Sequence, residues 1–213
     1  MTNTGLVSHN KFKYLTVMDS NNKIELAIQR IDEANSADPS VESIGGQEVA
    51  KELLYAQIMS NRLHEFYPDA PEELQLAARA QHICRWEIPR SDYSMDRDGY
   101  LTWRNNLKKF HAEKAGRILS DVGYENSMIE RVQSLIQKKR LKRDPLSQAL
   151  EDVVCLVFLE YYFESFAEKY EEDKLLDILK KTWAKMSDQG HEAALKLPLS
   201  STSLSLVSKA VKA

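Results

Sequence analysis

Three polar side chains, His82, His111 and Asp152, interrupt the apolar stripes of three expected helices. Imidazole and carboxylate groups are the ligand types that suit zinc, iron, manganese and similar divalent ions. One histidine on an apolar stripe is more often a core residue with satisfied hydrogen bonds, whereas three such interruptions on three helices favour a shared site. The residue types therefore support two hypotheses, a metal centre and a structural polar cluster without a metal.

Asp152 belongs to the most informative helical stretch, which is apolar on two sides and is therefore expected to be central. At 100° per residue, its side chain shares a face with Leu156, Leu159 and Phe163. Burying a carboxylate there is costly unless a cation, a metal or several hydrogen bonds compensate. The alternative to a metal ligand is a carboxylate early in a helix that pairs with backbone N–H groups or with an arginine.

Basic side chains flank these positions in the sequence. The candidate phosphate-binding or substrate-binding residues are Arg79, Arg85, Arg90, Lys138 and Lys139. Guanidinium forks suit phosphate oxygens, so these side chains could hold a phosphate ester beside the candidate ligands. The alternative is a set of solvated helix ends, where basic residues face the C-terminal carbonyl groups.

Helical periodicity accounts for nearly the whole chain and predicts an all-α fold. Seven glycines and six prolines are few for an all-β fold with many tight turns. About seven helices are expected, near residues 21–35, 47–66, 71–82, 103–122, 125–140, 145–170 and 172–186. We expect a polar N-terminal segment over 1–20, one helical domain over 21–196 and a flexible serine-rich tail over 197–213. His82 should lie near the end of the third helix.

Composition and charge exclude few function classes. A net charge of −3 and a pI near 6.0 provide no general attraction to nucleic acid or to a membrane surface, so neither is an expected partner. No apolar run reaches membrane-spanning length, and the N-terminal residues do not look like a secretory signal. The two cysteines lie within apolar helical patterns and are expected to be thiols in a reducing compartment. These features predict a cytoplasmic protein.

Three stretches of the chain resemble the HD-domain superfamily, which comprises all-helical, metal-dependent phosphohydrolases, and within it an HD-like family of unknown function. The stretches are LLYAQIMSNRLHEFYPDAPEELQLAARAQHI, FHAEKAGRILSDVGYENSMIERVQSLI and DPLSQALEDVVCLVFLE, and the resemblance covers about residues 52–166. It implies a single-domain HD-like bundle of about seven helices.

The resemblance also implies roles for individual residues. His82 corresponds to the histidine of the His-Asp doublet, His111 to an accessory metal histidine, and Asp152 to the distal aspartate. The sequence departs from the pattern because Ile83 occupies the doublet's aspartate position and Glu52 the first histidine position. The implied site is one manganese, iron, nickel or zinc ion held by His82, His111, Asp152 and Glu52, and an empty polar cluster remains the alternative. We predict that these side chains converge in three dimensions.

Two functions follow from these expectations. The first is a metal-dependent phosphohydrolase that acts on a nucleotide or a small phosphorylated metabolite. The second is a degenerate HD-like scaffold that binds a nucleotide, RNA or a protein partner without catalysis, and Ile83 is the residue that favours it. Metal content distinguishes the two.

Overall fold

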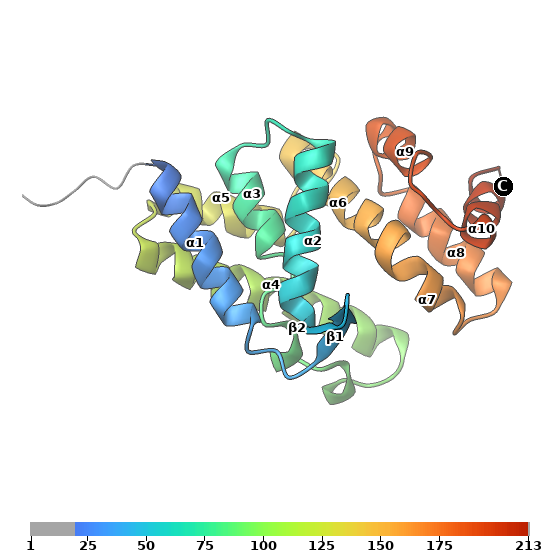
Figure 1. The fold of residues 1–213 in the computed structure, drawn as a ribbon, viewed down its shortest axis with the longest axis horizontal. Coiled ribbons are helices and arrows are strands. Elements are labelled where there is room, and N and C mark those ends of the chain that lie inside the picture. The colour runs from blue at the N-terminus through green and yellow to red at the C-terminus, as the bar shows by residue number, and fades with distance from the viewer. Residues whose placement is uncertain (1–19, 213) are drawn as a thin grey trace, which may run out of the picture.

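Helices dominate the computed structural model, which describes residues 20–212 (Figure 1). The ten α-helices in this range are α1 (Ser20–Asn35), α2 (Lys51–Phe66), α3 (Glu72–Arg79), α4 (Arg97–Val122), α5 (Asn126–Ile136), α6 (Pro145–Val157), α7 (Phe163–Ala167), α8 (Glu172–Trp183), α9 (Asp188–Ala194) and α10 (Ser201–Lys212). The expected mainly helical fold is therefore correct. The expected count of about seven helices is not.

Three additional helices, α7, α9 and α10, explain the higher count, and α9 lies in a stretch where no helix was expected. The stretch expected as one helix over 145–170 consists of α6, a π-helical turn over Phe158–Tyr162, and α7. The tail expected to be flexible from residue 197 contains α10, whose Leu206 and Val207 are buried. This apolar face packs on α8, so the tail is attached. The expected N-terminal segment lies outside the described residues apart from its last position.

A short antiparallel hairpin precedes α2 and was not expected. Its strands are β1 (Val41–Ile44) and β2 (Gln47–Ala50), with Val41 opposite Ala50 and Ile44 opposite Gln47. Gly45 and Gly46 form the two-residue turn with φ values of 57° and 83°. Positive φ at both positions suits glycine, and a Gly-Gly pair is a known hairpin signal.

Two hydrophobic clusters make up the core of residues 20–212. The first is built by α1 to α6, and the second by α6 to α10 together with the π-helical turn. Helix α6 contributes to both, because Val153 and Val157 belong to the first cluster whereas Leu156 belongs to the second. Figure 1 shows α8, α9 and α10 gathered at the end of the molecule away from α1, with α6 and α7 leading to them. The two-sided apolar pattern of α6 therefore reflects its central position.

Helix α4 begins six positions before the expected start at Trp103. The Asp96 side chain caps it by accepting a hydrogen bond from the Gly99 backbone N–H at 2.7 Å. The early start matters for the site because it gives α4 another full turn beside the cavity described below. None of the helices in residues 20–212 has the length and apolar character needed to cross a membrane.

Candidate functional site

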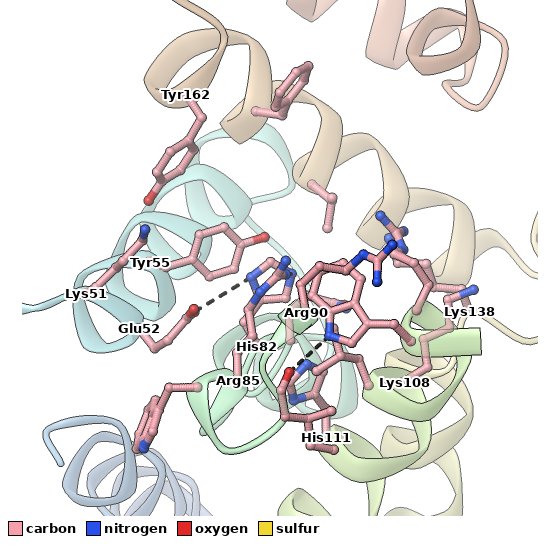
Figure 2. A pocket seen from close by; sticks show the side chains of 18 of the residues that line it. Lys51, Glu52, Tyr55, His82, Arg85, Arg90, Lys108, His111, Lys138 and Tyr162 are labelled. Carbon is pink, nitrogen blue, oxygen red and sulfur yellow. Dashed lines mark hydrogen bonds and ion pairs between the residues drawn. The ribbon is translucent and has the colours of Figure 1, made fainter. Parts of the chain in front are cut away.

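A cavity of about 640 Å³ lies between α2, the turn after α3, α4, α6 and α8. Figure 2 shows Glu52 and Tyr55 on one side of it, Lys108 and Lys138 on the other, and His82, Arg85 and Arg90 between them. Seven basic and three acidic side chains line the cavity. They are Lys51, Arg85, Arg90, Arg104, Lys108, Lys138 and Lys185, with Asp38, Glu52 and Glu151.

His82 reaches the cavity from the turn that follows α3, and not from the helix as expected. The chain reverses at Cys84, whose φ of 51° is in the left-handed region. The Asn35 side-chain carbonyl holds this conformation by accepting a hydrogen bond from the Cys84 backbone N–H at 3.0 Å. Such backbone conformations cost energy and often accompany functional sites.

The His82 ring contacts Tyr55 at its face and Arg85 at its edge. It stacks on Tyr55 with ring centroids 4.1 Å apart, and Arg85 Nη1 lies 3.2 Å from Nε2. Since a guanidinium can only donate, Nε2 accepts this hydrogen bond and the ring proton is on Nδ1. Burial, followed by the charge of Arg85, holds the pKa of His82 well below its usual value, so the ring is neutral at pH 7.

Glu52 faces the protonated nitrogen of His82. Its Oε2 lies 3.7 Å from His82 Nδ1, which is beyond a direct hydrogen bond (dashed in Figure 2). Burial raises the pKa of Glu52 to about 7, although Arg85 opposes this rise. A carboxyl group with this pKa can accept or release a proton near neutral pH.

His111 lies next to His82, with ring centroids 5.8 Å apart. Its Nδ1 is 2.8 Å from the carbonyl oxygen of Ile83, which can only accept, so Nδ1 carries the proton. Nε2 is buried and has no hydrogen-bond partner among the described residues. Burial lowers the pKa of His111 to about 4, so Nε2 remains an acceptor at neutral pH.

Basic side chains gather around Glu151 at the opposite side of the cavity. Lys138 forms an ion pair with Glu151, and Lys185 Nζ lies 4.0 Å from Glu151 Oε1. Burial alone would raise the pKa of Glu151, but attraction by Lys138 and Lys185 holds it below the usual value. Lys138 has a φ of 57°, so its ion pair is formed from a strained backbone position.

Lys108 lies near Glu151 but forms no direct ion pair with it. Among residues 20–212 no salt bridge or hydrogen bond involves its ammonium group. Burial, followed by repulsion from Lys138 and Arg104, lowers its pKa. An anion in the cavity would relieve this repulsion.

The expected phosphate-binding residues separate into two groups. Arg85, Arg90 and Lys138 line the cavity, although the Arg90 guanidinium also donates to loop carbonyl groups, including that of Tyr93 at 3.0 Å. Arg79 and Lys139 do not line it. Arg79 pairs with Asp32 on α1, with its Nε 2.7 Å from Oδ1, and Lys139 is exposed to solvent.

Asp152 does not lie with the two histidines, so the predicted convergence of this residue with them is wrong. Its buried carboxylate accepts hydrogen bonds from the Ser187 backbone N–H at 2.8 Å, the Ser187 hydroxyl at 2.6 Å and Gln148 Nε2 at 3.1 Å. These hydrogen bonds compensate for the free-energy cost of burying the Asp152 carboxylate, and no metal is needed. The alternative expectation, a carboxylate paired with backbone N–H, describes its environment better.

The remaining donors do not fit the expected metal ion. Among the described residues, no group of three or more histidine, cysteine, aspartate or glutamate side chains is arranged to hold one. His82 Nε2 is turned to the Arg85 guanidinium, and a cation at this position opposes binding of a divalent ion. His82, His111 and Glu52 share the cavity wall, but they do not form a three-ligand site.

Sequence reasoning missed several residues that line the cavity. They are Tyr55, Arg104, Lys108, Glu151 and Lys185. Arg104, Lys108 and His111 follow the i, i+4, i+7 spacing of one helix face, so the position of His111 was a usable signal for the other two. Lys185 comes from beyond α8, and no local pattern connects it to this site.

Comparison with known proteins provides one match. Residues 25–207 match the model of a family described as a domain of unknown function, DUF4202. No curated protein and no solved structure matches the chain. The matched range extends from α1 into α10 and includes all buried residues of both hydrophobic clusters except Ala210.

Proposed function

The chain belongs to this DUF4202 family, and we propose that its cavity binds a small phosphorylated molecule. The charge of the cavity supports the proposal, because seven basic side chains line it against three acidic ones. Glu151 is already paired with Lys138, and the raised pKa of Glu52 reduces its negative charge at neutral pH. The cavity therefore has an excess of positive charge that suits a phosphate group.

The single observation that carries the proposal is the ammonium group of Lys108, which forms no direct ion pair among residues 20–212. It lies in a cavity wall beside two further cations, Arg104 and Lys138, which lower its pKa after burial does. Holding like charges together costs free energy unless an anion compensates. A phosphate ester placed against Lys108 and Arg104 would supply that anion.

Calorimetric titration with inorganic phosphate tests this proposal. We expect Lys108→Gln to weaken phosphate binding by about tenfold, because the variant loses a charge-assisted contact. Lys139→Gln is the matched control, since Lys139 is exposed and outside the cavity. Equal effects of the two variants, or no phosphate binding by the unmodified protein, would contradict the proposal.

Hydrolysis of a phosphate ester is a second candidate, favoured by the position of Glu52. We propose that ionised Glu52 takes a proton from an attacking water while the charge of the phosphate is neutralised by Arg85 and Lys51, the basic side chains whose charges act on Glu52. The water oxygen forms the new bond to phosphorus, the P–O ester bond breaks, and the released alkoxide takes up the proton that Glu52 removed from the water. The HD-like resemblance of residues 52–166 implies nucleotides and small phosphorylated metabolites as substrates, whereas the metal-dependent reaction of that superfamily is not part of this candidate.

Phosphate-release assays distinguish hydrolysis from binding alone. If Glu52 is the base, Glu52→Gln should reduce turnover by roughly a hundredfold or more while substrate still binds. A protein that binds phosphate esters but releases no phosphate would instead support the alternative of a degenerate HD-like scaffold. Neither candidate requires a metal ion at the two histidines.

A further inference from the structure

Two hydrogen-bond acceptors on uncharged side chains that line the cavity are buried and have no partner among the described residues. They are His111 Nε2 and Gln81 Oε1, and their residues are 2% and 4% exposed. Among the described residues neither atom receives a hydrogen bond. Leaving a buried acceptor unsatisfied costs about 1–3 kcal/mol, so a donor placed beside these two atoms, from water or from a bound molecule, would be stabilising.

The acceptor role of His111 is set by the fold. The Ile83 carbonyl oxygen, 2.8 Å from Nδ1, keeps the ring proton on that nitrogen. Nε2 is therefore the acceptor in the neutral ring. Gln81 directly precedes His82 in the turn after α3 and lines the same cavity.

The nature of the donor follows from the surrounding charge. An ammonium group would be repelled by Arg85 and by the excess of basic side chains in the cavity. A divalent metal ion finds no third ligand among residues 20–212. A neutral hydroxyl group can donate to either acceptor without adding positive charge.

We infer that the ligand is a phosphate ester of a polyol or sugar, with hydroxyl groups that donate to His111 Nε2 and Gln81 Oε1. This inference rests on the proposed function, because the phosphate group is the part of the ligand held by the basic residues around Lys108. It adds a recognition element for the organic part of the molecule. A phosphate ester without hydroxyl groups would leave both acceptors unsatisfied.

Two pairs of compounds isolate the contribution of the hydroxyl groups. Glycerol 3-phosphate and propyl phosphate share a three-carbon chain, and ribose 5-phosphate and tetrahydrofurfuryl phosphate share a five-membered ring. Calorimetry on the full chain should show that the hydroxylated member of at least one pair binds about tenfold more tightly. Propyl and tetrahydrofurfuryl phosphates are the more apolar members, so simple hydrophobic binding would favour the opposite order.

Two variants test whether His111 Nε2 and Gln81 Oε1 cause the difference in affinity between the two members of a pair. His111→Phe and Gln81→Met each remove one acceptor and keep a side chain of similar size. Each should reduce the affinity ratio within the pair by about threefold, whereas Lys139→Gln should leave the ratio unchanged. Because the variants act at separate positions, loss of folding in one still allows the other to be measured.

The outcomes separate this inference from the function on which it rests. Equal affinities within both pairs, or ratios unchanged in both variants, would overturn the inference even if inorganic phosphate binds. Failure of every compound to bind, inorganic phosphate included, would overturn the proposed function and the inference with it.

Discussion

The carboxylate of Asp152 accepts two hydrogen bonds from Ser187, one from its backbone N–H and one from its hydroxyl group. Ser187 is also the N-cap of α9, because its hydroxyl oxygen accepts a hydrogen bond from the Gly190 backbone N–H at 3.1 Å. Asp152 lies on α6, so this pair fixes the start of α9 against the helix that contacts both hydrophobic clusters. Its role is to dock α9.

Asp152→Asn should therefore lower stability without weakening ligand binding. The amide NH₂ of asparagine cannot accept, so at least one buried donor from Ser187 or Gln148 loses its partner. We expect the free energy of unfolding to fall by about 1–3 kcal/mol in urea titrations. Asp69→Asn is a surface control, because Asp69 is exposed. Unchanged stability together with lost phosphate binding would contradict the docking role.

Gly190→Ala tests the same contact from the side of α9. A Cβ atom added at Gly190 would lie 2.6 Å from Asp152 Oδ1 and 2.8 Å from Asp152 Cγ, so the two helices must move apart. Thermal and urea unfolding should show a loss of about 1–3 kcal/mol. Glu192→Ala, at an exposed position of the same helix, should change stability little. A stabilised Gly190→Ala protein would show that α9 does not pack on Asp152 in this way.

Glu52 should make stability depend on pH. Its pKa rises from 4.5 to about 7 on folding because the carboxyl group is buried. Between these values the unfolded state loses the proton and the folded state retains it, so stability falls as pH rises and then levels above pH 7. The unfolding free energy of the unmodified protein minus that of Glu52→Gln should decline by about 3 kcal/mol over this range.

The control for this measurement is Glu48→Gln, since Glu48 is exposed. Urea titrations of the three proteins at several pH values between 4.5 and 8 provide the comparison. A pH-independent difference between the unmodified protein and Glu52→Gln would mean that the pKa of Glu52 is the same in the folded and unfolded states, which would contradict this prediction.

Metal content is expected to be well below one ion per chain. The Arg85 guanidinium lies 3.2 Å from His82 Nε2, so its positive charge would repel a divalent ion there. The Asp152 carboxylate is hydrogen-bonded to Ser187, which leaves too few ligands for a metal ion. Elemental analysis of protein purified without chelator or affinity histidines measures this. A stoichiometric manganese, iron, nickel or zinc ion that is lost in His111→Ala would instead establish a metal centre.

The hydrophobic periodicity of the sequence was sufficient to predict most helices and the burial of His111 and Asp152. The 3.6-residue periodicity indicated α1, α2, α5 and α8 within a few residues, and the apolar neighbours of His111 and Asp152 indicated that both side chains are buried. The hairpin was missed because its four-residue strands are mostly exposed and carry little alternation. The π-helical turn after α6 was missed because the apolar spacing continues through it.

The sequence by itself determined which segments are helical and which polar residues must find partners inside the protein. Tertiary structure decided what those partners are. Asp152 meets Ser187 because α9 packs on α6, whereas Glu151, one residue earlier, points into the cavity toward Lys138. Periodicity assigns a side chain to one face of a helix, but the element that covers that face is set by the packing of helices far apart in the chain. The cavity's excess of positive charge arises from that packing, because α2, the segment after α3, α4, the turn at Lys138 and the segment after α8 each bring cations to one place.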